Sequence, residues 1–229
     1  MNTTDFLEIA AAICPERDAI VFDGKRWTFQ QLQERVNRAA NFLAGFGVGK
    51  GDRVGMLQVN CNQYVEAYFA SAILGAIFVP LNFRAKSEEL EYLLAHSKSK
   101  VVLTGNRYLD LIQPLRGKLP HLQEVITLDE PVEGLPYYQD LMDQASSEPR
   151  QPEAEEDEVT ILMYTSGTTG LPKGVPQTHK AFVSYLLSSV EPANPEIEER
   201  NLLTVPLYHV AGIQAVMAAV YGGRTLVML

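Results

Sequence analysis

Short apolar runs alternate along the chain with stretches in which apolar residues recur every three or four positions, as in buried strands and amphipathic helices. The clearest helical stretch runs from Thr28 to Gly47. Thr28 and Gln31 match the capping box that begins a helix, and Gly45 and Gly47 are typical of its end. This helix would bury one stripe of apolar residues: Phe29, Leu32, Val36, Ala39, Ala40 and Leu43.

The other apolar runs predict strands at 53–59, 77–81, 100–105, 124–128, 159–165, 201–205 and 224–229. Helices are predicted from near Asn62, over 87–97, around 107–117, near 179–190 and near 210–221. Ser87 is a candidate N-cap, because Glu88 and Glu89 follow in the first turn, where the helix dipole favours acids. The alternation of strands and helices predicts an α/β fold, with mainly parallel sheets covered by helices.

Two segments bear on the organisation of the chain. Residues 146–158, SSEPRQPEAEEDE, are interpreted as a solvated acidic connector, with a binding tail as the alternative. The run 224–229, RTLVML, predicts a buried strand on which the chain stops, although complete domains rarely end inside such a strand. We therefore expect a fragment of a longer protein, whose exposed last strand could support a homodimer.

Composition excludes several classes of function. Of the 229 residues, 46% are hydrophobic and 21% charged, as in ordinary globular proteins. The net charge of -9, without a basic cluster, argues against nucleic-acid binding. The longest apolar stretch, 71–81, is shorter than the ~20 residues of a membrane span, and the amino terminus lacks the positive charges of a signal peptide. Cys14 and Cys61 show no metal or redox spacing, so a cytoplasmic protein with reduced thiols is expected.

The stretch YTSGTTGLPKG, residues 164–174, directly follows an apolar strand and has the composition of a phosphate-binding loop. Glycines let backbone N–H groups approach phosphate oxygens, here at Gly167, Gly170 and Gly174. Further hydrogen-bond donors are the hydroxyls of Thr165, Ser166, Thr168 and Thr169. Lys173 adds a mobile positive charge. The spacing fits neither the Walker A motif nor the dinucleotide fingerprint, and a plain surface loop is the competing interpretation.

These residues resemble the phosphate-loop signature of the adenylate-forming superfamily, which comprises acyl- and aryl-CoA synthetases, firefly luciferase and nonribosomal-peptide adenylation domains. Residues 27–56 resemble the opening helix and strand of that family, and PLYHVAGI, 206–213, resembles its next motif. Such enzymes condense a carboxylate with ATP, release pyrophosphate and pass the acyl group to CoA, a carrier-protein thiol or oxygen. The resemblance implies that residues 1–229 form the incomplete N-terminal domain of the adenylate-forming fold, without its C-terminal domain.

The resemblance also implies roles for single residues. Lys173 would contact the pyrophosphate leaving group, where charge accumulates during attack on the α-phosphate. Thr165 would in addition help to hold Mg²⁺. The phosphates would be embraced by six consecutive residues, Thr165, Ser166, Gly167, Thr168, Thr169 and Gly170.

The second motif separates branches of the family. A lone histidine is commonly structural, but acyl- and aryl-CoA synthetases carry one at the position of His209, beside the adenylate and the acyl pocket. Gly212 would leave room for the tail of the substrate. Amino-acid adenylation domains usually have a different stretch there. His209 therefore favours an ATP-dependent CoA ligase. The alternatives are a module that loads a carrier protein and a non-catalytic nucleotide-binding module.

The later family motifs cannot be located before residue 229. They would supply the adenine pocket, the magnesium-binding glutamate, the ribose-binding aspartate, the hinge and the catalytic lysine. We therefore expect this chain alone to be inactive or nearly so, and the choice among fatty, aryl and short-chain acids stays open. Of the other histidines, His96 and His121 are expected to face solvent, and His179 to be structural.

Overall fold

The computed structural model describes residues 1–165 and 171–229, and its larger sheet has six strands. All neighbouring strands of this sheet run parallel except β7 and β8, which form an antiparallel hairpin. This arrangement confirms the mainly parallel α/β fold. The strands follow the order β6 (Glu124–Thr127), β5 (Val101–Thr104), β3 (Arg53–Leu57), β4 (Ile77–Pro80), β7 (Val159–Thr165) and β8 (Lys173–Thr178).

The smaller sheet has four strands and contains the last strand of the chain. Their order is β2 (Lys25–Thr28), β1 (Asp18–Phe22), β10 (Thr225–Met228) and β9 (Arg200–Leu203). Strand β10 pairs in parallel with β1 on one side and with β9 on the other. The expectation that the last strand leaves an exposed edge is therefore wrong, because both of its edges are hydrogen-bonded. The homodimer was expected only because of that exposed edge, so the structure gives no support for it.

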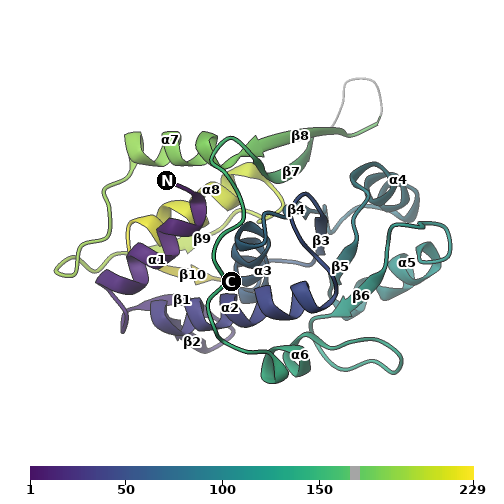
Figure 1. Cartoon of the computed structure of the whole chain (residues 1–229), viewed down its shortest axis with the longest axis horizontal. Helices are drawn as coiled ribbons and strands as arrows, with labels where there is room; N and C mark the ends of the chain where they lie inside the picture. Colours follow the sequence, from purple (N-terminus) through teal and green to yellow (C-terminus); the bar gives the residue numbers. More distant parts are fainter. Residues whose placement is uncertain (166–170) are drawn as a thin grey trace.

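Four helices form a layer between the two sheets (Figure 1). They are α1 (Thr3–Ile13), α2 (Phe29–Gly45), α3 (Asn62–Ile73) and α8 (Val210–Tyr221). In this layer α2 contacts β1 and β2, α8 contacts β9 and β10, and α3 contacts β4 and α2. Helices α4 (Ser87–Ser97) and α5 (Leu109–Ile112) cover the other face of the larger sheet through a second apolar cluster. Two further helices are α6 (Tyr138–Gln144), against α2, and α7 (His179–Ser189), against α8.

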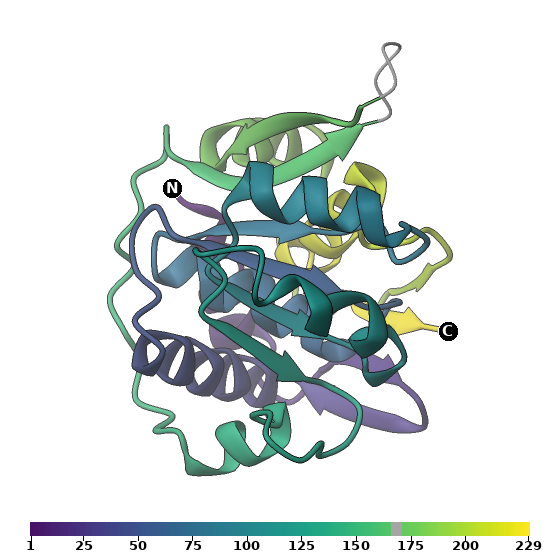
Figure 2. The same cartoon turned by 90° about the vertical axis from the view of Figure 1, so that its right-hand side faces the viewer.

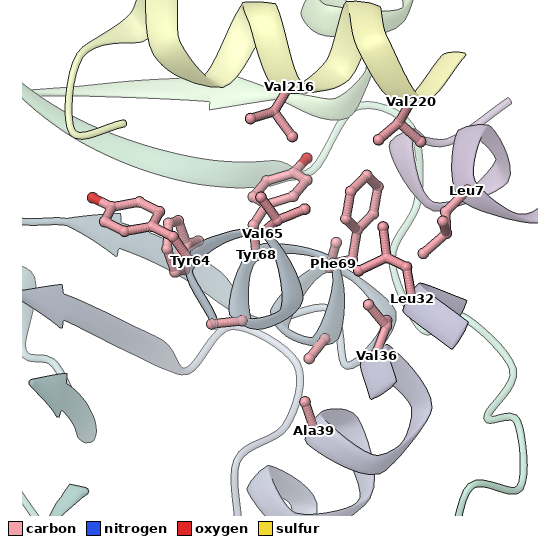
Figure 3. Close-up of a cluster of buried hydrophobic side chains, with 14 of the residues drawn as sticks. Leu7, Leu32, Val36, Ala39, Tyr64, Val65, Tyr68, Phe69, Val216 and Val220 are labelled. Atoms are coloured by element: carbon pink, nitrogen blue, oxygen red, sulfur yellow. The ribbon is translucent and has the colours of Figure 1, made fainter. Parts of the chain in front are cut away.

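Helix α3 is the centre of the core, since nearly all of its residues are buried. In Figure 3 its side chains Tyr64, Val65, Tyr68 and Phe69 lie between apolar residues of the three neighbouring helices. These neighbours are Val216 and Val220 from α8, Leu32, Val36 and Ala39 from α2, and Leu7 from α1. A helix surrounded in this way needs apolar residues on every side, which explains why its sequence shows a weaker stripe than that of α2.

Local sequence signals account for most helix boundaries. Helix α2 begins as predicted: the Thr28 hydroxyl accepts a bond from the Gln31 N–H, and the Gln31 side chain accepts one from the Thr28 N–H. The predicted N-cap at Ser87 is wrong, because Lys86 holds that position and Ser87 is the first helical residue. The predicted helix over 107–117 is reduced to α5 and two flanking 3₁₀ turns, since Pro114 has no N–H with which to continue a helix.

The segment 146–158 carries no regular helix or strand and crosses the surface between α6 and β7. It is nevertheless attached to the body of the protein. The Asn41 amide donates to the carbonyls of Ser146 and Glu148 at 2.8 and 2.9 Å, and the Glu153 N–H donates to the Ile73 carbonyl at 3.0 Å. These contacts fix the path of the chain into β7, and thereby where the glycine-rich stretch begins.

Candidate functional site

The two arms of the glycine-rich stretch are the antiparallel strands β7 and β8. Thr165, the last residue of β7, pairs in register with Lys173, the first residue of β8. Both side chains are exposed, and Figure 2 shows the two arms ending together at one edge of the molecule. The fold therefore brings Thr165 and Lys173 side by side. The other predicted phosphate-binding residues lie outside the described residues: Ser166, Gly167, Thr168, Thr169 and Gly170.

A hollow of about 650 Å³ lies at the carboxyl ends of β4 and β7. Its wall combines polar, acidic and aromatic side chains from four places in the sequence. They are Pro80, Asn82, Glu88, Glu89, Tyr92, Leu93, Tyr164, Thr165, Leu171, Pro172, Tyr208 and His209. Thr165 and His209, predicted from two separate motifs, thus line one cavity. The carboxyl end of parallel strands is where α/β sheets commonly bind ligands.

His209 occupies the N-cap position of α8, and its side chain is exposed at the hollow. Its ring packs against that of Tyr208, with ring centroids 4.2 Å apart. Tyr208 in turn meets Phe83 edge-on, at a centroid distance of 5.3 Å and an interplanar angle of 88°. The Tyr208 ring covers one face of the imidazole, while the imidazole nitrogen atoms can form hydrogen bonds with a bound molecule.

Gly212 has a different role from the one expected. A Cβ atom at this position would lie 2.4 Å from the carbonyl oxygen of Pro206 and 2.9 Å from the Cα of Leu207. Gly212 is buried and belongs to the first turn of α8. The space freed by its missing side chain is therefore filled by the protein backbone, so the expectation that it admits a substrate tail is wrong.

Helix α4 contacts β7 and the residue that directly precedes β8. The Tyr92 hydroxyl donates to the Pro172 carbonyl at 3.1 Å, and Nδ1 of His96 lies 2.8 Å from the Tyr164 hydroxyl. His96 is exposed as predicted, but it also has this partner on β7. Burial raises the pKa of Tyr164 to about 12, so at neutral pH its hydroxyl keeps the proton. Sequence reasoning missed Tyr92, which lies within α4, and Tyr208, whose only signal was its position directly before His209.

His179 lies apart from the hollow, inside the protein. It is 1% exposed, and its Nδ1 atom lies 2.8 Å from the hydroxyl of Thr3. The Tyr68 hydroxyl donates to the same Thr3 oxygen at 2.8 Å and lies 3.1 Å from that of Thr160. Burial lowers the pKa of His179 to about 4, so the ring is neutral near pH 7. These contacts agree with the structural role expected for it.

Comparison with known proteins places the chain in a family. The model of the family described as "AMP-binding enzyme" matches residues 7–229, and the chain belongs to that family. The long-chain-fatty-acid–CoA ligase of Thermus thermophilus is 34% identical over 217 residues, which cover 92% of this chain and 40% of that protein. The feruloyl-CoA synthase of an Amycolatopsis species is 34% identical over 220 residues, which cover 95% of this chain and 42% of that protein.

Solved structures agree with this assignment. The anthranilate CoA ligase AuaEII in complex with anthranoyl-AMP superposes with a TM-score of 0.93 at 28% identity, over 100% of this chain and 45% of that chain. The inhibitor-bound N-terminal domain of FACL13 from Mycobacterium tuberculosis superposes with a TM-score of 0.89 at 30% identity, over 100% of this chain and 57% of that chain. The predicted resemblance to adenylate-forming enzymes is confirmed. The chain spans about 40% of the length of the curated relatives it matches.

Proposed function

We propose that this chain provides the phosphate loop and one wall of the acid site of an ATP-dependent carboxylate–CoA ligase. The main support is the meeting of Thr165 and His209, 44 positions apart in the sequence, at one hollow beside the glycine-rich stretch. A site that activates a carboxylate must hold the nucleotide phosphates and the acid side by side. The family membership and the CoA ligases among the relatives point to the same reaction.

In the proposed first step, a carboxylate oxygen attacks the α-phosphorus of ATP. The bond from that phosphorus to the bridging oxygen breaks, and pyrophosphate leaves with the charge. Lys173, beside Thr165 at the open end of the hairpin, is suited to stabilise this charge. In the second step the sulfur of CoA attacks the acyl carbon and the thiol gives up its proton to solvent. The bond from the acyl carbon to the phosphate oxygen breaks, and AMP departs.

The charges on the wall suggest where each substrate lies. Glu88 and Glu89 line the hollow on the α4 side and would repel a triphosphate placed inside it. We therefore place the phosphates toward Lys173 and the predicted loop residues Ser166, Gly167, Thr168, Thr169 and Gly170. The acyl group and the adenylate linkage then lie toward Tyr208 and His209.

Thr165 is the one residue that we predict to help hold Mg²⁺. Among the residues described, no group of three or more His, Cys, Asp or Glu side chains could hold a metal ion. Magnesium at a nucleotide usually keeps several waters and takes most other ligands from phosphates, so one protein hydroxyl is compatible with it. When bound, the ion would neutralise charge on the phosphates. Thr165, exposed at the end of β7, would orient it there.

The acid and the location are proposed more broadly. Several relatives are named for long-chain fatty acids, feruloyl and indoleacetate groups, and one for 4-hydroxybutyrate. We propose an apolar or aromatic carboxylic acid, as in most of these names. Within the described parts of the chain, no helix is both long and apolar enough to cross a membrane. A cytoplasmic location, where ATP and CoA are available, fits the proposed reaction.

Carboxylate-dependent ATP–pyrophosphate exchange tests this function. The assay would use this chain and, in parallel, the longest gene product that carries it, with fatty, aryl, short-chain and amino acids. We expect exchange by the longer product with one acid class, followed by thioester formation with CoA and not with a carrier protein. This chain alone is expected to show little or no exchange. Absence of exchange with every acid in both proteins would refute the ligase.

A further inference from the structure

Asn60 connects the two sheets close to the hollow. It follows the carboxyl end of β3, in the larger sheet, and reaches the segment between β9 and α8. Its side-chain nitrogen donates to the carbonyl of Val205 at 3.0 Å, and its side-chain oxygen accepts from the N–H of Leu207 at 2.8 Å. One planar amide thus satisfies two backbone groups on the same edge of the segment.

Gly212 packs against the same segment through its own close contact. Its Cα approaches Pro206 so closely that no Cβ could be accommodated. The N–H of His209 donates to the Pro206 carbonyl at 3.1 Å, and the N–H of Gly212 donates to the His209 carbonyl at 3.0 Å. Residues 205–207 are therefore held by Asn60 and by the first turn of α8. The next two residues of the chain are Tyr208 and His209, which line the hollow.

These contacts connect the end of β3, through Asn60 and the segment 205–207, to the two residues that line the hollow. Without the Asn60 amide, two backbone groups of the segment 205–207 lose their bonds to the larger sheet. The segment would then be located mainly by α8, in the helical layer, and by β9, in the smaller sheet. His209 lines the hollow with Thr165, which ends a strand of the larger sheet. A small shift between the sheets would therefore change the placement of His209 relative to Thr165.

We propose that Asn60 is a positioning residue for the acid site: with Gly212, it fixes residues 205–207 so that Tyr208 and His209 face the hollow. The inference rests on the proposed function, because it concerns the acid that His209 would contact. It assigns Asn60 no contact with the substrate. Its requirement is a side chain with one donor and one acceptor in a plane, which aspartate or alanine does not provide.

The test compares Asn60→Ala with Asn106→Ala in the longest gene product that carries this chain. Asn106 is a matched control, because its side chain donates to the Glu130 carbonyl at 3.0 Å and accepts from the Asp129 N–H at 3.4 Å, at the ends of β5 and β6. We expect Asn60→Ala to raise the KM for the acid about tenfold, with the KM for ATP within about twofold of wild type. Asn106→Ala should change neither KM.

A second measurement follows His209 directly. With histidine labelled at Cε1, the resonance of His209 is assigned by its loss in His209→Gln. Asn60→Ala should shift this resonance, and Asn106→Ala should not. Asn60→Asp keeps the shape and the bond from the Leu207 N–H but loses the donor to Val205. It should give an intermediate shift, and it replaces Asn60→Ala if that variant does not fold.

The outcomes separate the two proposals. Unchanged resonances and KM values in both Asn60 variants, or equal changes in Asn106→Ala, would overturn the positioning role. Loss of exchange in the wild type with every acid would remove the proposed function. The His209 resonance would still decide whether Asn60 positions that residue.

Discussion

The helical layer around α3 and the hollow beside β7 both contain polar side chains. In the helical layer a group of these side chains is buried and joined by hydrogen bonds, whereas at the hollow several are exposed. Inside the layer, Glu66 is fully buried, and its carboxylate accepts two bonds from Arg35, at 2.7 and 3.1 Å. It also accepts one from Asn62 at 2.7 Å and one from Tyr138 at 2.9 Å. At the hollow, by contrast, Thr165 and His209 are exposed.

This difference shows what distinguishes a structural polar group from a functional one. A buried carboxylate is tolerated only when its oxygen atoms are paired, and the Glu66 network meets that condition with residues from α2, α3 and α6. Polar groups at the wall of a concave surface are still available to a ligand. Removing a residue from the first region should therefore affect folding, and removing one from the second should affect chemistry.

The largest effect is expected at the hollow. Lys173→Ala should lower ATP–pyrophosphate exchange by the longest gene product by about 10²–10³-fold, because it removes a charge that stabilises the leaving pyrophosphate. The urea midpoint should stay near wild type, since Lys173 is exposed. Lys180→Ala is the matched control, because Lys180 is an exposed lysine paired with Asp157 at 3.1 Å, and its activity should be unchanged. Equal losses in both variants would remove the distinction between the two regions.

The next largest effect is expected in the helical layer. Glu66→Ala should lower the free energy of unfolding by about 3–5 kcal/mol, because Arg35 loses its buried partner. In the folded protein burial opposes the charged form of Arg35, but the Glu66 carboxylate outweighs burial and raises the pKa of Arg35. In Glu66→Ala this favourable effect is lost, while an arginine side chain stays charged in proteins, so the variant keeps a charge without its partner. The double variant Arg35→Met with Glu66→Leu should recover much of the loss. Urea unfolding measures both, and a loss below about 1 kcal/mol in Glu66→Ala would show that the network is not structural.

Acid should weaken the contact of α7 with α1. The pKa of His179 is about 4 in the folded protein and about 6.5 in an unfolded chain, so only the unfolded chain binds the proton between these values. Folding stability is therefore unaffected by this group above pH 6.5 and falls as the pH approaches 4, by about 3 kcal/mol. The free energy of unfolding, measured with urea from pH 7 to pH 4, should therefore fall less steeply with decreasing pH in His179→Gln than in wild type. If the free energy of unfolding changed with pH equally in His179→Gln and wild type, this prediction would be contradicted. His121→Gln is the control and should give the same pH dependence as wild type.

The smallest effect is expected for Tyr92→Phe, at the hollow. This change removes the hydrogen bond to the Pro172 carbonyl but keeps the ring, so stability should fall by only about 1 kcal/mol. The KM for ATP should rise by a few fold, because α4 then contacts the second arm of the hairpin less firmly. Steady-state exchange and urea unfolding on the same preparation measure the two changes. A large loss of stability with unchanged KM would assign Tyr92 to the core instead.

Part of the fold could be read from local patterns. The stripe of apolar residues in α2 and its capping box gave correct boundaries, because both depend on neighbours within one helix. The hairpin of β1 and β2 was missed, although Asp23 and Gly24, both with positive φ, form the kind of turn that such a pair indicates. Helix α1 was also missed, although Asn2 and Asp5 form its capping box.

The sequence by itself determined the strands of the larger sheet except β8, the phosphate-loop composition and the candidate residues Thr165, Lys173 and His209. Each of these depends on residue type and short-range spacing. The tertiary structure decided that β10 lies inside the smaller sheet, that the space at Gly212 is taken by Pro206, and that Asn60 reaches the segment before His209. Such contacts join residues far apart in the chain, so they cannot be predicted from the spacing of apolar residues within one helix or strand. They follow from how the sheets and helices pack together.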